Sequence, residues 1–310
     1  MRKTDKSIQS MLLELYKQHQ HNKKWNTASL YKSAIVKVDK FTKGKEILFS
    51  KISPRWLKSF EGYMRSSGNS WNTISTYMRI LNAAYNEAVS TNKATFQPFI
   101  FNKVYTGVVS DRQNALDAQD MEKLIKLCFD ENSPLKPKLQ QTLQFFILMF
   151  LLRGMPFIDL VFLKKKELKR NAISYRRVKT GKPLVVELEK PALELINVLM
   201  SKDESSPYLF PFLHYPEDSE QAYKEYKTTL RRINNQLRTI GSILCIQHKI
   251  STYTARHTWI TIAFTCNISS AIISQSVGHS SIKVTETYLK PFQQRAINVA
   301  NRQVIQAVMP

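Results

Sequence analysis

Several side chains that can act on a phosphodiester follow one another in a fixed order through the second half of the sequence. His279 follows Arg256 by 23 residues, and Tyr288 follows His279 by nine. Upstream come Arg153, at the end of an apolar stretch, and Lys179, in a Lys-Thr-Gly-Lys turn. Guanidinium groups bind phosphate oxygens with paired donors, histidine and lysine can move protons, and a tyrosine hydroxyl can act as a nucleophile. This set of residue types is suited to phosphoryl transfer without a metal ion.

Each of these residues also has a simpler structural interpretation when it is taken alone. Tyr288 is then a half-buried aromatic side chain, and Arg153 is a cation that stabilises a helix C-terminus. Lys179 and Lys182 share one turn, and either can be a charge at a hairpin tip. Tyr253 can be a core aromatic residue or a donor to a phosphate oxygen. The order and the spacing favour the catalytic interpretation, and of the two lysines we favour Lys179.

The charge of the chain points to a polyanionic partner. The 310 residues carry a net charge of +22. Up to Arg112 there are 19 Lys and Arg against 7 Asp and Glu, and after it 27 against 17, so the excess is not confined to a tail. Because neutralising phosphates releases counterions, such a field favours nucleic acid as the partner, with a membrane surface as the alternative. The longest apolar run, residues 145–152, is too short to span a membrane, and no secretory signal is visible.

Cysteine and glycine usage excludes other classes of protein. The three cysteines, Cys128, Cys245 and Cys266, are widely spaced in apolar surroundings. We expect reduced core thiols in a cytoplasmic protein, and neither a disulfide framework nor a zinc site. With eight glycines the chain has no P-loop or dinucleotide-binding fingerprint. The sequence therefore predicts no cofactor, no metal and no ATP-driven step.

A basic helical domain is expected first, in residues 1–104. Apolar residues recur at helical spacing from Ile8 onward, and again after starts near Asn26 or Thr27, Ser53 and Asn72. The second of these helices is expected to bury a face made of Leu30, Ala34, Val38 and Phe41. No periodic pattern continues through residues 105–114, which we interpret as a linker.

A second domain is expected over residues 115–310. Its long, nearly all-apolar helix, residues 138–152, should be central to the core. Ile173, Tyr175 and Arg177 alternate before the turn, which predicts a β-hairpin over residues 172–188. Further helices are expected over residues 117–129, 191–200, 220–238, 254–266, 269–277 and 282–289, with an amphipathic tail from Pro291. The fold class is mainly α with a small β-hairpin or sheet (α+β).

In this order the motifs resemble the signature of the tyrosine site-specific recombinases, the phage-integrase family. That signature runs Arg, Lys in a β-hairpin, His-x-x-Arg, Leu-Gly-His and, nine residues later, a nucleophilic Tyr. The matching stretches here contain Lys179, Ala255-Arg256-His257, Val277-Gly278-His279 and Thr285-Glu286-Thr287-Tyr288. The resemblance covers nearly the whole chain, because a helical core-binding domain ahead of a catalytic domain is also the family's plan.

The resemblance implies a mechanism and an assembly. Tyr288 attacks the scissile phosphate, giving a 3′-phosphotyrosyl link and a free 5′-hydroxyl. Arg256 neutralises phosphate charge, His279 binds the same oxygens and helps Tyr288 lose its proton, and Lys179 protonates the leaving oxygen. Double-stranded DNA is the expected partner, and four protomers, a homotetramer, join two sites on it. The tail after Pro291 is then a candidate to dock on a neighbouring protomer, the alternative being that it packs on its own.

Two positions depart from the family pattern. The first Arg of the family falls at Pro156, and Arg153 lies about one helical turn earlier. This displaced arginine resembles a subgroup found on mobile elements; if Arg153 does not supply the charge, Arg177 or Lys182 could. Tyr253 stands where the family commonly has His. Because the pKa of a phenol is about 10, it is a poor proton shuttle, and its expected role is positioning.

The two departures leave other functions open. One is a DNA-binding accessory factor that keeps the fold and has lost cleavage. Another is a type IB topoisomerase, which uses a similar tyrosine set but brings no two sites together. The sequence does not say which DNA site is used, or whether the outcome is integration, excision, inversion or resolution.

Overall fold

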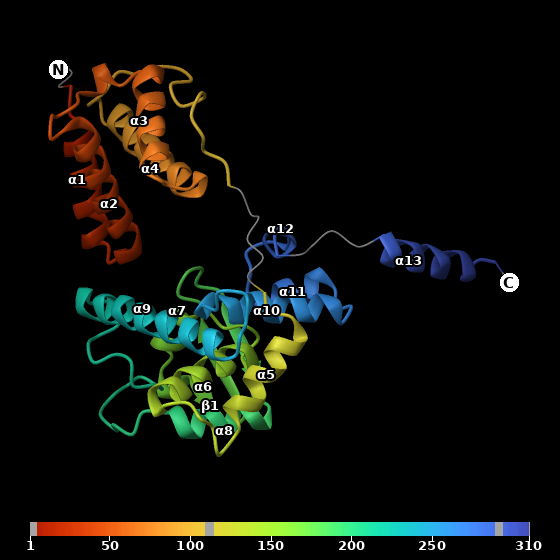
Figure 1. Cartoon of the computed structure of the whole chain (residues 1–310). Helices are drawn as coiled ribbons and strands as arrows, with labels where there is room; N and C mark the ends of the chain where they lie inside the picture. Colours follow the sequence, from red (N-terminus) through yellow and green to blue (C-terminus); the bar gives the residue numbers. More distant parts are fainter. Residues whose placement is uncertain (1–4, 109–114, 289–293, 310) are drawn as a thin grey trace. The chain divides into compact units, whose positions relative to one another are not determined.

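The computed structural model of the chain describes residues 5–108, 115–288 and 294–309. Helices predominate, and the strands form a three-stranded antiparallel sheet (Figure 1). The expected fold class, mainly α with a small sheet, is confirmed. The chain divides into two compact units, Met1–Asp111 with Asp218–Glu220, and Arg112–Glu217 with Gln221–Pro310.

The N-terminal unit is a helical module with its own core. Its elements are α1 (Ile8–His21), α2 (Trp25–Thr42), η1 (Phe49–Lys51), α3 (Pro54–Ser66) and α4 (Trp71–Ser90). The apolar faces of these helices share one core, in which α1 packs against α2 and α4. The expectation that Leu30 is buried is wrong: it is 45% exposed, because it lies at the edge of the α2 face formed by Tyr31, Ala34 and Val38.

Two helix starts in this unit differ from those expected. The chain turns at Lys23, which has a φ of 55°, and α2 begins at Trp25, ahead of Asn26 and Thr27. The cap of α4 is Ser70 and not Asn72, because the Ser70 hydroxyl accepts the hydrogen bond of the Thr73 N–H. The cap of α3 at Ser53, followed by Pro54, is confirmed.

The C-terminal unit surrounds α6 (Pro137–Leu151), whose apolar run is the centre of the larger core. This helix packs against α5 (Ala118–Cys128), α8 (Lys190–Leu199) and α10 (Thr252–Thr265). A short helix that was not expected, α7 (Phe157–Phe162), begins directly after Pro156. The remaining helices are α9 (Glu220–Ile243), α11 (Ser270–Ser276), α12 (Ile282–Glu286) and α13 (Gln294–Gln306).

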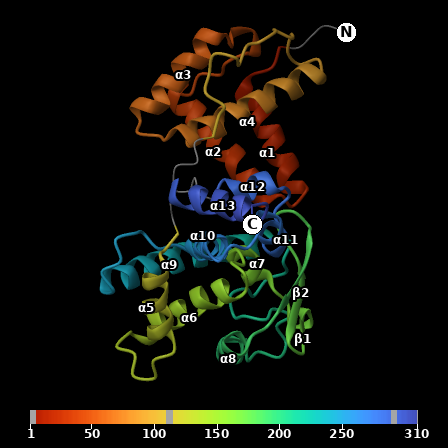
Figure 2. The same cartoon turned by 90° about the vertical axis from the view of Figure 1, so that its right-hand side faces the viewer.

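The expected hairpin is present and gains a third strand. The order is β1 (Leu168–Lys169), β2 (Ala172–Arg176) and β3 (Pro183–Glu187), and the sheet lies at one side of the unit (Figure 2). β1 follows the short 3₁₀ helix η2 (Lys165–Glu167) and has two residues, too few to show a period in the sequence. Tyr175 pairs with Leu184 and Arg176 with Pro183, so the turn holds residues 177–182.

The tail after Pro291 lies partly outside the described residues, as do Leu289 and Pro291 themselves. The side chains of Val304 and Ile305 in α13, and of Val308 after it, are exposed. Docking of this tail on a neighbouring protomer stays a prediction.

The cysteine prediction is wrong for two of the three residues. Cys128 is buried, and burial raises the pKa of its thiol to about 12. Cys245 and Cys266 are exposed. Cys266 ends α10, and Cys245, with a φ of 53°, follows α9, so both stand where the chain turns at a helix end. Apolar neighbours in the sequence do not bury a residue at such a turn.

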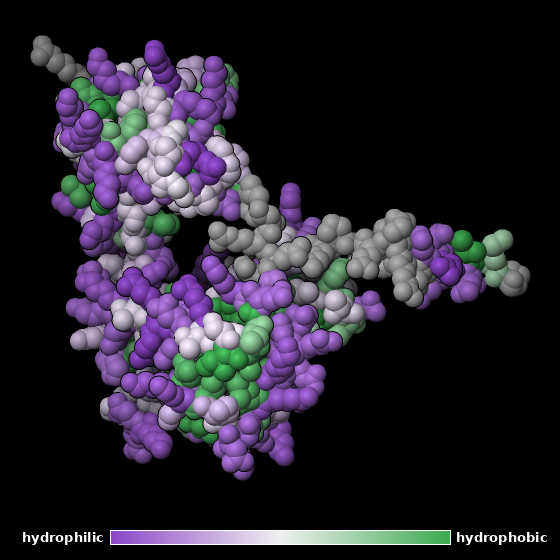
Figure 3. Space-filling model, in the orientation of Figure 1, coloured by the Kyte–Doolittle hydropathy of each residue, from purple (hydrophilic) through white to green (hydrophobic). Residues whose placement is uncertain are grey.

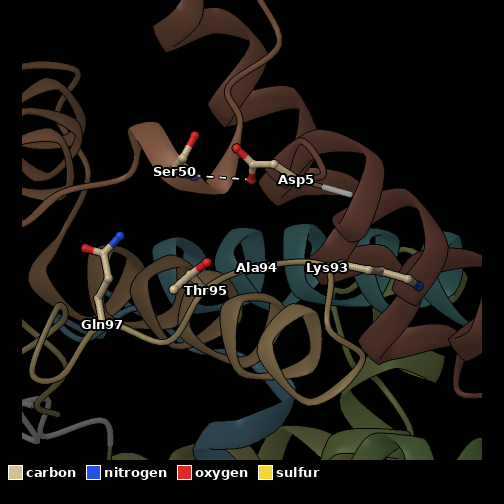
Figure 4. A pocket seen from close by; sticks show the side chains of 6 residues that line it. All are labelled: Asp5, Ser50, Lys93, Ala94, Thr95 and Gln97. Carbon is tan, nitrogen blue, oxygen red and sulfur yellow. Dashed lines mark hydrogen bonds between the residues drawn. The ribbon is translucent and has the colours of Figure 1, made fainter. Parts of the chain in front are cut away.

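Three surface pockets among the described residues contain none of the residues expected to do chemistry. On the N-terminal unit a pocket of about 240 Å³ is lined by Asp5, Ser50 and Lys93, among others, and the Ser50 N–H donates to the Asp5 carboxylate (Figure 4). A hydrophobic area is visible where α5, α6 and α8 lie (Figure 3). There Phe129 and Leu151 help to line a pocket of about 320 Å³. Among the described residues no helix is long and apolar enough to cross a membrane.

Candidate active site

Arg256 is fixed in the first turns of α10. The helix begins at a reciprocal pair of contacts between Ser251 and Thr254, in which the Ser251 N–H donates to the Thr254 hydroxyl at 3.0 Å. Arg256 is 3% exposed and donates to the carbonyl oxygens of Gly154, at 3.1 Å, and Val277, at 2.7 Å. A Cβ at Gly154 would lie 2.7 Å from the Arg256 Cα, and its φ is +67°, so only glycine fits there. The predicted arginine is therefore held rigidly.

A second buried guanidinium, that of Arg177, lies beside that of Arg256. It follows β2 and is 8% exposed. Its Nε donates to Asp159 Oδ2 at 2.7 Å, and its Nη1 to the carbonyl oxygens of Val277, at 2.8 Å, and Gly278, at 3.1 Å. The other oxygen of Asp159 accepts the Val178 N–H at 2.8 Å. Asp159, on α7, thus fixes both the side chain and the backbone at the base of the hairpin turn.

Arg177 and Arg256 share an acceptor, the carbonyl oxygen of Val277. Burial and the neighbouring charge of Arg177 lower the pKa of Arg256, which means that its charged form lacks full compensation. Asp159 balances one of the two positive charges. An anion bound beside this pair would stabilise both, and planar guanidinium groups match the geometry of phosphate oxygens.

His279 lies against this pair and is neutral at physiological pH. It is 7% exposed, and its Nδ1 is 2.8 Å from the hydroxyl oxygen of Thr285. Burial, followed by the charges of Arg256 and Arg177, lowers the pKa of His279 to about 4. A neutral imidazole can both accept and donate a proton. The ring stacks on Tyr288, with centroids 5.3 Å apart.

Tyr288 is enclosed by aromatic rings, and its hydroxyl meets that of Tyr253. The two hydroxyl groups form a hydrogen bond across 35 residues of sequence. His257 lies beside both tyrosine rings, with its centroid 4.7 Å from that of Tyr253 and 4.6 Å from that of Tyr288. The structure thus brings Tyr253, Arg256, His279 and Tyr288 together as expected from the sequence, and it places His257 against Tyr288 as well.

The two candidate lysines both lie near His279. Lys182 donates to the His279 carbonyl oxygen at 3.2 Å. Lys179 is exposed in the turn, and its charge, like that of Lys182, contributes to the lowered pKa of His279. Lys182 is therefore held, whereas Lys179 stands at the tip of the turn.

The guanidinium of Arg153 contacts the sheet at strand β3. Arg153 has a φ of 58° just after α6, and its Nη1 donates to the Val185 carbonyl oxygen of β3 at 3.3 Å. The carbonyl oxygen of the next residue, Gly154, accepts a hydrogen bond from Arg256, so Arg153 adjoins the buried pair along the chain while its own guanidinium binds β3. Arg177, predicted from the sequence as an alternative to Arg153, is the arginine that shares an acceptor with Arg256. The alternation of Ile173, Tyr175 and Arg177 was the available signal, since it puts all three on the buried face.

Comparison with known proteins gives a consistent result over the whole chain. The phage integrase SAM-like domain matches residues 10–104, and the phage integrase family matches residues 114–295. Among solved structures, the Tn1549 transposon integrase in complex with transposon right end DNA is 14% identical over 96% of this chain and 99% of that chain, with a TM-score of 0.66. No curated protein matches.

Two further solved structures are similar. A lambda integrase dimer bound to a core site is 14% identical, with 94% of this chain and 81% of that chain covered and a TM-score of 0.65. The XerH recombinase bound to difH is 14% identical, with 88% of this chain and 78% of that chain covered and a TM-score of 0.62. The fold is thus that of the tyrosine recombinases and integrases. The chain belongs to the phage integrase family, whose model covers more than half of it.

Proposed function

We propose that the protein is a site-specific DNA recombinase that cleaves and rejoins strands through a 3′-phosphotyrosyl intermediate on Tyr288. The observation that carries the proposal is the cluster itself: a tyrosine hydroxyl, a neutral histidine and two buried guanidinium groups that share one carbonyl oxygen. Nothing in this set requires a cofactor. Among the described residues no group of three or more His, Cys, Asp or Glu could hold a metal ion.

Charge on the scissile phosphate is neutralised by Arg256 and a second arginine. Arg177 fits that role because it is buried beside Arg256, and Arg153 stays a candidate through its position one turn before Pro156. The accessory-factor alternative was based on the departures at Pro156 and Tyr253. The pair of buried guanidinium groups removes the first of these objections and supports cleavage.

The bonds and protons of the reaction balance within this set. The Tyr288 oxygen forms the new bond to phosphorus as the bond to the 5′ oxygen breaks. The proton of Tyr288 passes to a neutral acceptor, for which His279 is the candidate because its ring stacks on that of Tyr288. A lysine, Lys179 or Lys182, gives a proton to the 5′ oxygen. Ligation is the reverse of these steps with another strand's 5′-hydroxyl, so the bond energy is kept and no ATP is needed.

DNA binding is proposed for both domains, with residues 1–104 as the core-binding domain, 105–114 as a linker and 115–310 as the catalytic domain. The net charge of +22 supports this proposal. The Tn1549 and lambda integrase structures are complexes with DNA. We expect four copies of the protein, a homotetramer, to assemble on two DNA sites in the cytoplasm.

The test uses DNA that flanks the gene and contains short inverted repeats around a strand-exchange region. The full-length protein should form a covalent adduct on a nicked suicide substrate of that sequence, and Tyr288→Phe should bind it and form none. Two labelled sites in one reaction should give recombinant strands. Relaxation of supercoils without any recombinant product would instead indicate a topoisomerase, and an adduct formed by Tyr288→Phe would remove Tyr288 from the mechanism.

A further inference from the structure

The position at which the family commonly has His carries Tyr253, and its hydroxyl meets the proposed nucleophile. We propose that Tyr253 is a positioning residue that aims the Tyr288 hydroxyl and donates a hydrogen bond to it as it becomes a phenolate. This inference rests on the proposed function of Tyr288. It replaces the expected contact of Tyr253 with a phosphate oxygen by a contact with the attacking oxygen.

The geometry supports a fixed arrangement of the two hydroxyls. Tyr253 lies in the first turn of α10, which is fixed by the Ser251 cap and by a hydrogen bond from the Thr252 N–H to Asn234 Oδ1 at 2.8 Å. His257, one turn later, lies edge-on to the Tyr253 ring at 4.7 Å and against the Tyr288 ring at 4.6 Å. The imidazole therefore packs against both rings, whose centroids are 6.4 Å apart, and the hydrogen bond joins their hydroxyl groups.

The surroundings decide which hydroxyl keeps its proton. Burial raises the pKa of Tyr253, and negative charge on Tyr288 raises it further, while Arg256 and Arg177 lower it by less. His257 and His279, the other titratable groups against the two rings, each have a pKa lowered to about 4 and are neutral at physiological pH. Tyr253 therefore stays protonated and acts as the donor when Tyr288 loses its proton.

The size of the effect follows from the charge on the acceptor. A hydrogen bond to a charged group contributes more than one between neutral groups, and its loss corresponds to about 10- to 100-fold in an equilibrium. Without the donor, the phenolate of Tyr288 is less stable, so a given rate is reached only at higher pH. The loss should therefore be constant along the rising limb of the pH–rate profile and shrink only where the rate of the unchanged protein reaches its plateau.

The experiment measures single-turnover adduct formation by Tyr253→Phe between about pH 6 and pH 9.5. We expect a rate about 10- to 100-fold below that of the unchanged protein at pH 7, with the rising limb of the pH–rate profile shifted to higher pH and DNA binding unaltered. Tyr208→Phe is the matched control, because its hydroxyl donates to the Tyr215 carbonyl oxygen at 2.7 Å within the same unit. Tyr253→His, which restores a donor, should recover part of the rate.

Other outcomes separate this inference from the alternatives. A loss that persists undiminished on the plateau of the profile, or no loss at all, overturns it, because a phosphate contact or a structural role does not follow the ionisation of the nucleophile. A 5′-bridging phosphorothiolate, whose leaving group needs no proton, should leave the defect of Tyr253→Phe in place; its disappearance would assign Tyr253 to the leaving group. If Tyr288→Phe forms the adduct, the proposed function fails, whatever Tyr253→Phe does.

Discussion

Replacing Arg177 tests which arginine supplies the second positive charge to the phosphate. Its guanidinium is 8% exposed and shares the Val277 carbonyl oxygen with Arg256. Loss of one preorganised donor to a transition-state oxygen typically costs about 10²–10³ in rate. We expect Arg177→Met to lower cleavage by that factor. Arg153→Ala should lower it less, because Arg153 is bonded to the β3 backbone at 3.3 Å.

The stability of the variant must be separated from its catalysis. Asp159 is fully buried and pairs with Arg177 at 2.7 Å. Removing one partner of such a pair typically costs about 3–5 kcal/mol, because the other charge stays buried without compensation. The double variant Arg177→Met/Asp159→Asn removes both charges, and an amide oxygen can still accept the Val178 N–H. We expect it to regain most of the lost stability in urea unfolding and none of the lost cleavage rate.

The assay compares two substrates under single-turnover conditions. One carries the ordinary phosphodiester and the other a methylphosphonate at the scissile position, where the neutral phosphate needs less positive charge. The double variant should bind both, cleave the phosphodiester about 10²–10³ times more slowly than the unchanged protein, and recover partly on the methylphosphonate. Cleavage of the phosphodiester at the unchanged rate would refute the role of Arg177. If Arg153→Ala alone shows the full loss and the rescue, Arg153 supplies the charge.

Three further predictions concern binding, the leaving group and pH. Removing residues 1–104 should weaken DNA binding and flatten the dependence of log K on log salt by about 0.9 for each lost phosphate contact, measured by fluorescence anisotropy; an unchanged slope would place the contacts elsewhere. If Lys179 or Lys182 is the general acid, its alanine variant should lose cleavage of the phosphodiester and regain it on a 5′-bridging phosphorothiolate. If the phosphorothiolate rescues neither variant, neither lysine is the general acid. The pKa of His279 is 6.5 in the unfolded chain and about 4 in the folded protein, so the unfolded chain binds a proton first as pH falls. The free energy of unfolding should therefore be highest above pH 6.5 and decrease by up to about 3 kcal/mol as pH falls toward 4. Urea midpoints at pH 7.5 and pH 5 should differ less for His279→Gln, and an equal difference would mean that other groups cause the decline.

Local patterns in the sequence predicted most of the fold. The apolar run in α6 predicted the centre of the larger core, and Ser53 followed by Pro54 predicted the start of α3, because caps and periodicity depend on neighbouring residues. Where two candidates for a cap lay close together, as with Ser70 and Asn72, only the backbone geometry decided between them. The exposure of Leu30 was missed for a similar reason, since a face defined by spacing has no sharp edge.

The site was predictable in composition and less so in arrangement. The spacing from Arg256 to Tyr288 identified residues that the structure brings together. The pairing of Arg177 with Asp159 and the meeting of Tyr253 with Tyr288 depend on packing between elements far apart in the chain, which no local pattern encodes. The alternation in β2 indicated that Arg177 faces inward. That it lies beside Arg256 follows only from the fold.

The linkage between protein and DNA tests the central claim most directly. Adduct trapped on a suicide substrate can be digested with protease and nuclease, and the nucleotide-bearing peptide identified by mass spectrometry. The account predicts a nucleotide joined through its 3′ phosphate to the hydroxyl oxygen of Tyr288, in the peptide that follows Lys283. A nucleotide on Tyr253 or on any other residue, or a link through a 5′ phosphate, would contradict it.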